Sequence, residues 1–138
     1  MSHATLRQTV LDCREARPLA DFYRDLLGYE YRPGDETPED GEDWLVIRPP
    51  GGGHALAFQV NPEYVAPVWT PEPDRPGDQQ QMLHLDLTVP DVAALEEQRT
   101  RALARGATEL FDRSDDEEEP LYVFADPAGH PFCIFVAS

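Results

Sequence analysis

The chain has 138 residues, which is the size of one ordinary domain or of two small modules that share a core. Its formal net charge is −16, and all 11 of its basic residues are arginines without a basic cluster, which argues against a nucleic-acid partner. No apolar run is long enough to cross a membrane, and the N-terminus lacks a signal pattern, so we expect a cytoplasmic protein without a membrane partner.

The first half of the chain predicts a strand, a helix and two further strands. Alternating apolar residues indicate a strand over 6–13. Apolar residues at helical spacing follow Pro18, and Gly28 is a natural helix stop. A polar loop over 33–43 then leads to strands over 44–49 and 54–60.

The segment 61–81 differs from its surroundings, because it carries five prolines and no periodicity. This composition is typical of a linker. A solvated linker has little use for Trp69, however, and we expect that side chain to close over a ligand.

The second half repeats the pattern of the first. We expect a strand over 82–89 and then a helix with Asp91 as N-cap, an apolar stripe of Val92, Leu95 and Leu103, and a stop at Gly106. A short strand over 107–111, an acidic loop over 113–119, and strands over 121–126 and 130–137 complete the chain. The two cysteines, Cys13 and Cys133, are expected to be free thiols.

The motifs "LADFYRDLLGYE", "MLHLDLTVPD" and "DPAGHPFCIF" resemble those of the vicinal oxygen chelate superfamily, which includes glyoxalase I, extradiol dioxygenases and bleomycin-resistance proteins. Actinobacterial glyoxalase-like proteins resemble the chain most. The resemblance implies an α+β fold in which two tandem βαβββ modules form a cupped mixed sheet. Within a single domain over 1–138, module 1 would span 5–61, the proline-rich linker 62–81 and module 2 82–138. The resemblance also implies a homodimer.

In metal-using relatives the first and last strands of each module supply the ligands. Those places fall here on Gln8, on Ala57 or Gln59, on His84 and on Cys133. Neither carboxylate of the glyoxalase I pattern is present, so we expect no metal cofactor. The alternative is a divalent metal near Gln8, His84 and Cys133. Asp86 lies about 6–7 Å along the strand from His84 and would need an unusual bend to join such a site.

A metal-free cup needs aromatic walls and a few polar anchors. The expected ligand-binding residues, taken from both halves and the linker, are Gln8, Trp44, Arg48, Gln59, Trp69, His84, Tyr122 and Cys133. Three hypotheses follow: a metal-independent protein that sequesters a small molecule in the cup, an enzyme with a non-standard metal site, and a metal-free enzyme with His84 and Asp86 as an acid–base pair. We favour the first.

Overall fold

The structure is a computed structural model that describes residues 2–70 and 79–137. It divides into two compact units, Met1–Tyr64 and Val65–Ser138, each of which is described by itself. Of the predicted linker, residues 62–64 therefore fall in the first unit and residues 65–70 and 79–81 in the second. The rest of that segment, 71–78, lies outside the described residues.

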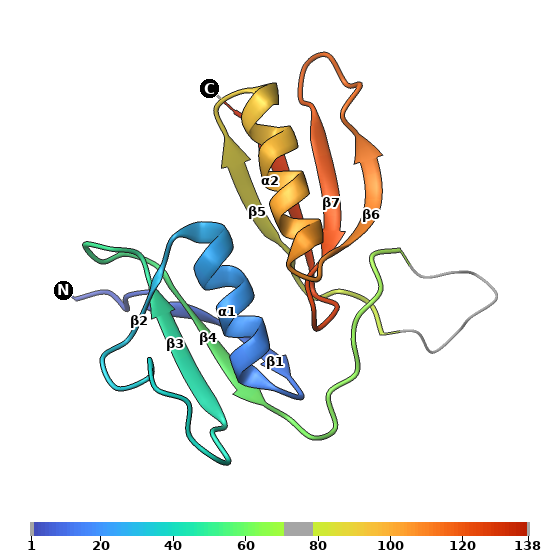
Figure 1. The fold of residues 1–138 in the computed structure, drawn as a ribbon. Helices are drawn as coiled ribbons and strands as arrows, with labels where there is room; N and C mark the ends of the chain where they lie inside the picture. The colour runs from blue at the N-terminus through green and yellow to red at the C-terminus, as the bar shows by residue number, and fades with distance from the viewer. Residues whose placement is uncertain (1, 71–78, 138) are drawn as a thin grey trace. The chain divides into compact units, whose positions relative to one another are not determined.

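The first unit has the order of strand, helix and three strands that the family resemblance implies (Figure 1). Its elements are β1 (Gln8–Cys13), α1 (Ala16–Leu27), β2 (Glu30–Tyr31), β3 (Trp44–Arg48) and β4 (Ala55–Val60). The sheet order is β1-β4-β3-β2, with β1 parallel to β4 and the other pairs antiparallel. The two-residue β2 was not assigned from the sequence, because two residues are too few to show strand alternation.

The helix α1 covers one face of this sheet. It ends where predicted, because Gly28 adopts the left-handed conformation (φ 70°) and its N–H donates to the Arg24 carbonyl. Tyr23 stacks on Phe58 of β4 with ring centroids 6.1 Å apart, and both side chains are fully buried. Because side chains alternate along a strand, Leu56 and Phe58 face the helix while Ala57 and Gln59 face away.

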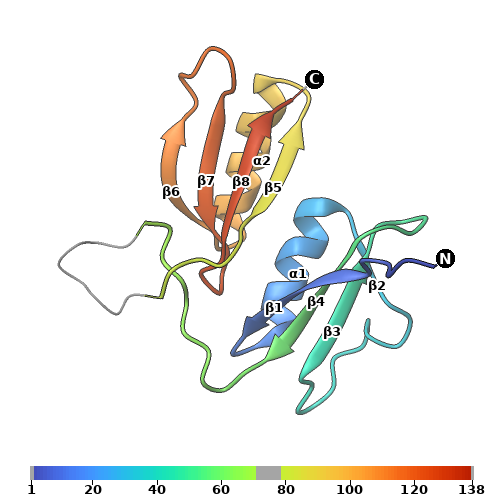
Figure 2. The same cartoon turned by 180° about the vertical axis from the view of Figure 1, so that it is seen from behind.

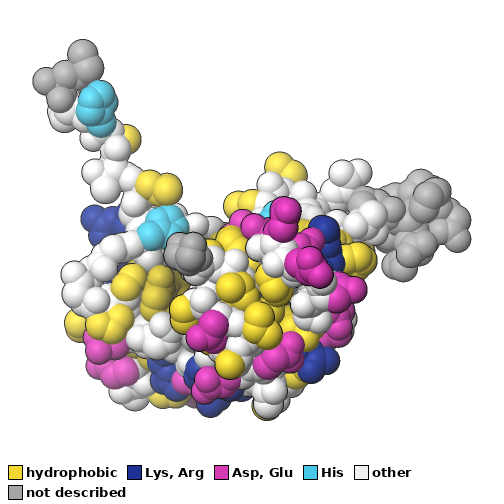
Figure 3. Space-filling model, turned by 90° about the horizontal axis from the view of Figure 1, so that it is seen from above, with side chains coloured by type: hydrophobic (Ala, Val, Ile, Leu, Met, Phe, Trp, Pro, Cys, Tyr) yellow, Lys and Arg dark blue, Asp and Glu magenta, His cyan; other side chains and the backbone are white. Residues whose placement is uncertain are grey.

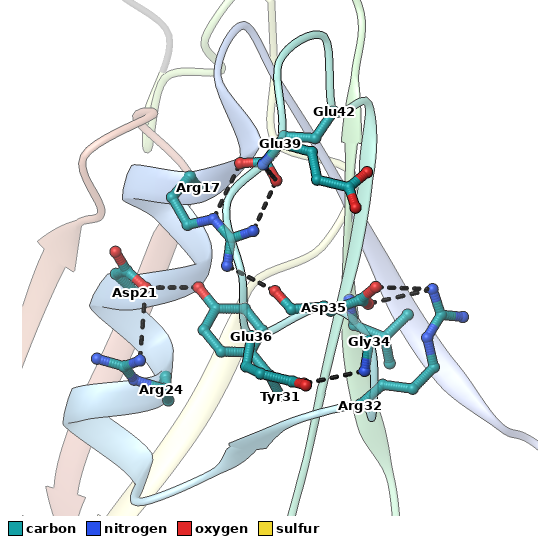
Figure 4. Close-up of polar contacts among 11 residues, drawn as sticks. Arg17, Asp21, Arg24, Tyr31, Arg32, Gly34, Asp35, Glu36, Glu39 and Glu42 are labelled. Atoms are coloured by element: carbon teal, nitrogen blue, oxygen red, sulfur yellow. Dashed lines mark hydrogen bonds and ion pairs between the residues drawn. The ribbon is translucent and has the colours of Figure 1, made fainter.

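The loop over 33–43 is fastened to α1 by Arg17 (Figure 4). The Arg17 guanidinium donates Nε–H to Glu42 Oε1 at 2.9 Å and Nη2–H to Oε2 at 2.6 Å. Its Nη1–H donates to the Asp35 carbonyl at 2.7 Å, and the Tyr31 ring lies against it. This loop therefore has a defined position despite its polar sequence.

The second unit repeats the arrangement (Figure 2). Its elements are β5 (Leu85–Val89), α2 (Val92–Ala104), β6 (Thr108–Arg113), β7 (Leu121–Ala125) and β8 (Pro131–Val136). The sheet order is β5-β8-β7-β6, with β5 parallel to β8 and the other pairs antiparallel. Two βαβββ modules of one fold are thus confirmed.

The buried side of α2 differs from the predicted stripe. Asp91 caps the helix as expected by accepting the Ala94 N–H, and Leu95 is fully buried. Val92 and Leu103, however, are exposed by 51% and 36%. The small Ala102 is buried in their place, so α2 contacts its sheet through a narrower strip than α1 does.

The strand predicted over 82–89 begins only at Leu85. The strand alternation predicts that Leu83 packs under the helix, but Leu83 is exposed by 53%. The residues just before β5, His84 among them, therefore do not follow the strand alternation. Among the described residues, no helix is long and apolar enough to span a membrane.

Candidate functional site

The face of the first sheet opposite α1 carries three of the predicted binding residues. Gln8, Trp44 and Gln59 lie on it by strand register, since Gln8 pairs with Ala55 and Trp44 pairs with Gln59. The Trp44 ring packs against a small apolar cluster of Val46, Ala55 and Ala57. This face of the first unit therefore holds a small buried apolar cluster with Trp44 beside it.

Arg48 shares the parity of Trp44 but stands at the end of β3, where it is exposed. Within the described part of the first unit, no ion pair holds its guanidinium. An arginine within a strand of so acidic a chain is expected to need a partner, either Asp86 or an anionic group of a ligand. The Asp86 alternative would join the two units, and both alternatives stay predictions.

Tyr122 does not lie on the open face of its sheet, which corrects its place among the predicted ligand-binding residues. Its hydroxyl donates to Glu96 of α2, the Arg99 guanidinium lies 5.1 Å from its ring centroid, and only 3% of the residue is exposed. Phe124 has the same parity and is fully buried. These two aromatics build the core under α2, because both side chains lie on the helix-facing side of β7.

The open face of the second sheet brings together His84, Asp86 and Cys133. Asp86 on β5 and Cys133 on β8 are direct neighbours across the parallel strand pair. His84 precedes β5, so its ring is free to turn back, and its Nε2 lies 3.3 Å from Asp86 Oδ1. The two side chains are therefore in contact, although the strand rise alone indicated a separation of about 6–7 Å.

Gln81 and Trp69 complete this corner. The Gln81 amide donates to the Trp69 carbonyl at 3.0 Å, and its Oε1 lies 3.1 Å from His84 Nδ1. The Trp69 ring meets the His84 ring edge to face, with centroids 5.1 Å apart. Gln81 was missed by the sequence analysis, and its place three residues before His84 in a polar run gave little signal.

The Cys133 side chain is a neutral thiol in this setting. Burial raises its pKa to about 11, and the neighbouring Asp86 carboxylate adds to the shift through its charge and hydrogen bonding. Because a thiol reacts as its thiolate, this environment makes Cys133 a poor nucleophile in the metal-free protein.

A separate surface cavity of about 470 Å³ lies in the first unit beside Arg17 and Glu42. Two of its charged groups, Arg17 and Glu42, are already engaged in the bidentate pair that anchors the 33–43 loop. The acidic side chains elsewhere are dispersed over the visible face among apolar groups and arginines (Figure 3). Neither feature concentrates chemistry as the His84 corner does.

A family model described as a glyoxalase-like domain matches residues 8–135. The chain belongs to this glyoxalase-like family. The match spans both units, and it agrees with the repeated βαβββ order of the structure.

Solved structures share the fold of this glyoxalase-like protein at low sequence identity. A glyoxalase/bleomycin resistance protein/dioxygenase family enzyme from Burkholderia phytofirmans PsJN has 15% identity and a TM-score of 0.72, with 98% of this chain and 100% of that chain covered. A glyoxalase/dioxygenase from Nostoc punctiforme has 18% identity and a TM-score of 0.68, with coverages of 97% and 91%.

TnmS3, an antibiotic binding protein from Streptomyces sp. CB03234, has 20% identity and a TM-score of 0.60, with coverages of 100% and 99%. No curated protein sequence matches the chain. These likenesses establish the fold, and the chemistry has to be argued from the residues.

Metal-using relatives raise the question of whether this glyoxalase-like chain has donors for a divalent ion. In the described residues, one atom each from His84, Asp86 and Cys133 lie within 4.8 Å of one another. An imidazole, a carboxylate and a thiol form a donor set that suits zinc-like ions better than magnesium or calcium. These three donors thus fit a metal ion. They differ from the donor set that the sequence suggested as an alternative, which included Gln8 and left out Asp86.

Proposed function

We propose that this protein binds a small organic molecule and holds it without converting it, at a site that includes Trp69, His84 and Asp86. One observation carries the proposal: the Trp69 ring is held against His84, with the exposed Asp86 carboxylate beside them. A ring edge next to hydrogen-bonding groups is the usual composition of a small-molecule site.

The chemistry of this corner favours a ligand with a planar apolar part and hydrogen-bond donors or a positive charge. Trp69 offers the apolar contact, and the Asp86 side chain, exposed by 57%, offers acceptor oxygens. The antibiotic-binding function named for the Streptomyces neighbour of the same fold supports a sequestering role.

Turnover of the glyoxalase I type is not expected. Both positions where the resemblance places a glutamate are occupied by other residues, Ala57 or Gln59 in the first unit and Cys133 in the second. A glutamate in that reaction also moves the substrate proton, and neither an amide nor a neutral thiol replaces it. Binding by the groups described needs no metal.

Catalysis by His84 and Asp86 is a second candidate function, favoured by the 3.3 Å contact between their side chains. An imidazole next to a carboxylate is a common acid–base pair.

We further propose that the protein acts as a cytoplasmic homodimer. Sedimentation equilibrium of the purified chain would test the dimer.

The test is a screen of small aromatic amines and natural-product antibiotics against EDTA-treated protein by thermal shift, followed by calorimetry. Trp69→Ala should weaken the binding of any hit by about tenfold or more, as expected for an aromatic anchor that a ligand covers. Tyr122→Phe, on the opposite face of the same sheet, should leave it unchanged. Mass spectrometry of the recovered hit separates the candidates, because an unaltered mass supports binding and an altered mass supports catalysis.

A further inference from the structure

The hydrogen bonds around His84 determine which ring nitrogen faces Asp86. The Gln81 amide must present its NH₂ group to the Trp69 carbonyl, at 3.0 Å, so its oxygen faces His84 Nδ1, at 3.1 Å. Nδ1 therefore carries the proton that this oxygen accepts. In the neutral ring, Nε2 is then an acceptor.

This tautomer places two acceptors against each other. The Nε2 lone pair and Asp86 Oδ1 lie 3.3 Å apart, a separation that only a positive charge between them makes favourable. Either a second proton on the imidazole or a metal cation supplies that charge. A partner on Nδ1 that fixes the ring is also the usual support of a metal-binding histidine.

Cys133 adds a third donor atom, and this favours a metal cation over a second imidazole proton as the source of the positive charge. Its thiol lies within 4.8 Å of the donor atoms of the other two residues. Donor atoms around a tetrahedral zinc ion lie about 3.3–3.8 Å apart, given bond lengths of about 2.0–2.3 Å. The His84–Asp86 separation already matches this spacing, and a small side-chain rotation brings the sulfur to it.

We propose that His84, Asp86 and Cys133 form a binding site for a thiophilic divalent cation of the zinc class, complete within the second unit. Sulfur and imidazole donors select this class over magnesium and calcium. On binding, the thiol proton leaves to solvent and the sulfur forms a bond to the cation. The side chains of His84 and Asp86 are exposed by 36% and 57%, so the cation reaches the site from solvent.

The proposal does not rest on the binding of an organic ligand, and its test uses the metal alone. The full-length protein, reduced and freed of metal, is titrated with Co²⁺, which occupies zinc sites and is visible in absorption. We expect one Co²⁺ per chain, a thiolate-to-cobalt charge-transfer band in the near ultraviolet, and displacement by Zn²⁺.

Variants assign the donors. Cys133→Ser should abolish the charge-transfer band, while the matched control Cys13→Ser should keep it, since Cys13 is buried in the first unit. Asp86→Asn, at an exposed position that tolerates substitution, should weaken Co²⁺ binding by more than the roughly 10- to 100-fold typical of an outer-sphere partner. Gln81→Ala should weaken it within that range, because it loses only the partner of Nδ1.

Gln8→Ala tests whether the site is complete within one unit, and Co²⁺ affinity should not change. The proposal is overturned if saturating Co²⁺ gives no charge-transfer band. It is also overturned if the band survives in Cys133→Ser, or if Gln8→Ala weakens binding as strongly as Asp86→Asn.

Discussion

The ion pair between Arg17 and Glu42 should contribute measurably to the stability of the first unit, and Glu42→Gln is the sharpest way to remove it. The substitution keeps the shape of the side chain but replaces one carboxylate oxygen by an NH₂ group. That group faces a guanidinium nitrogen, so two donors oppose each other where two hydrogen bonds of 2.9 and 2.6 Å existed.

The size of this stability contribution follows from the burial of the Arg17 and Glu42 side chains. The two side chains are exposed by only 16% and 19%, between the limits of a surface pair and a buried one. Surface pairs contribute less than about 1 kcal/mol, while breaking a buried pair costs roughly 3–5 kcal/mol. We expect Glu42→Gln to lower the free energy of unfolding by about 2 kcal/mol at neutral pH.

The pH dependence has a definite sign. The Arg17 guanidinium lowers the pKa of Glu42 below its ordinary value of 4.5, first by hydrogen bonding. The pair therefore stabilises the fold fully above that ordinary pKa, and its contribution disappears as the pH falls through the lowered value. The difference between wild type and Glu42→Gln should shrink over the same acidic range.

Urea unfolding followed by Trp44 fluorescence, in a Trp69→Phe background, reports on the first unit alone. Glu36→Gln is the matched control, because this exposed glutamate on the same loop accepts only the Gly34 N–H. A difference below about 0.5 kcal/mol at pH 7, or one that persists unchanged at acidic pH, would refute the assignment of stability to this pair.

Three further predictions concern the second unit. Leu95→Ala should cost about 2–5 kcal/mol in denaturant unfolding, because the fully buried Leu95 supplies most of the apolar contact of α2, and a loss below about 1 kcal/mol would contradict this packing. Tyr122→Phe should cost about 1–3 kcal/mol through the lost hydrogen bond to Glu96, whereas a loss of ligand binding with unchanged stability would place Tyr122 in the site. Gly129→Ala should raise the unfolding rate, because its φ is +97° and the new Cβ would lie 2.6 Å from Ala66 Cβ; Ala66→Gly should restore only part of the loss.

Most of the fold could be predicted from the sequence by strand alternation and by helix-capping residues. The segments 54–60 and 130–137 are strands as predicted, and Gly28 and Asp91 mark helix ends as predicted. These are local features, set by backbone geometry and by hydrogen bonds within a few residues. The predicted apolar stripe of α2 was wrong at Leu103. The burial of that residue depends on which side of the helix the sheet contacts, and this is not a local property.

The site was harder to predict for the same reason. His84 and Cys133 were named from their strand positions, and the structure does bring them together. Tyr122 was misplaced because an aromatic residue in a strand suits a pocket or a core equally well, and only its contact with Glu96 decides. Arg48 was expected to need a partner, yet a strand end leaves a guanidinium accessible to water, where it needs none.

The assignment of Asp86 shows how one residue of strand length changes the chemistry. Had β5 begun at Met82, as the alternation indicates, the backbone of His84 would be fixed by the ladder and its ring would stand parallel to the Asp86 side chain. Because β5 begins at Leu85, His84 is outside the ladder and its ring is directed by Gln81 and Trp69 instead. The 3.3 Å contact with Asp86 follows from that freedom. Substituting Gln81 should therefore affect every function of this corner, whether it holds a cation, an organic ligand or both, while the fold of the sheet stays intact.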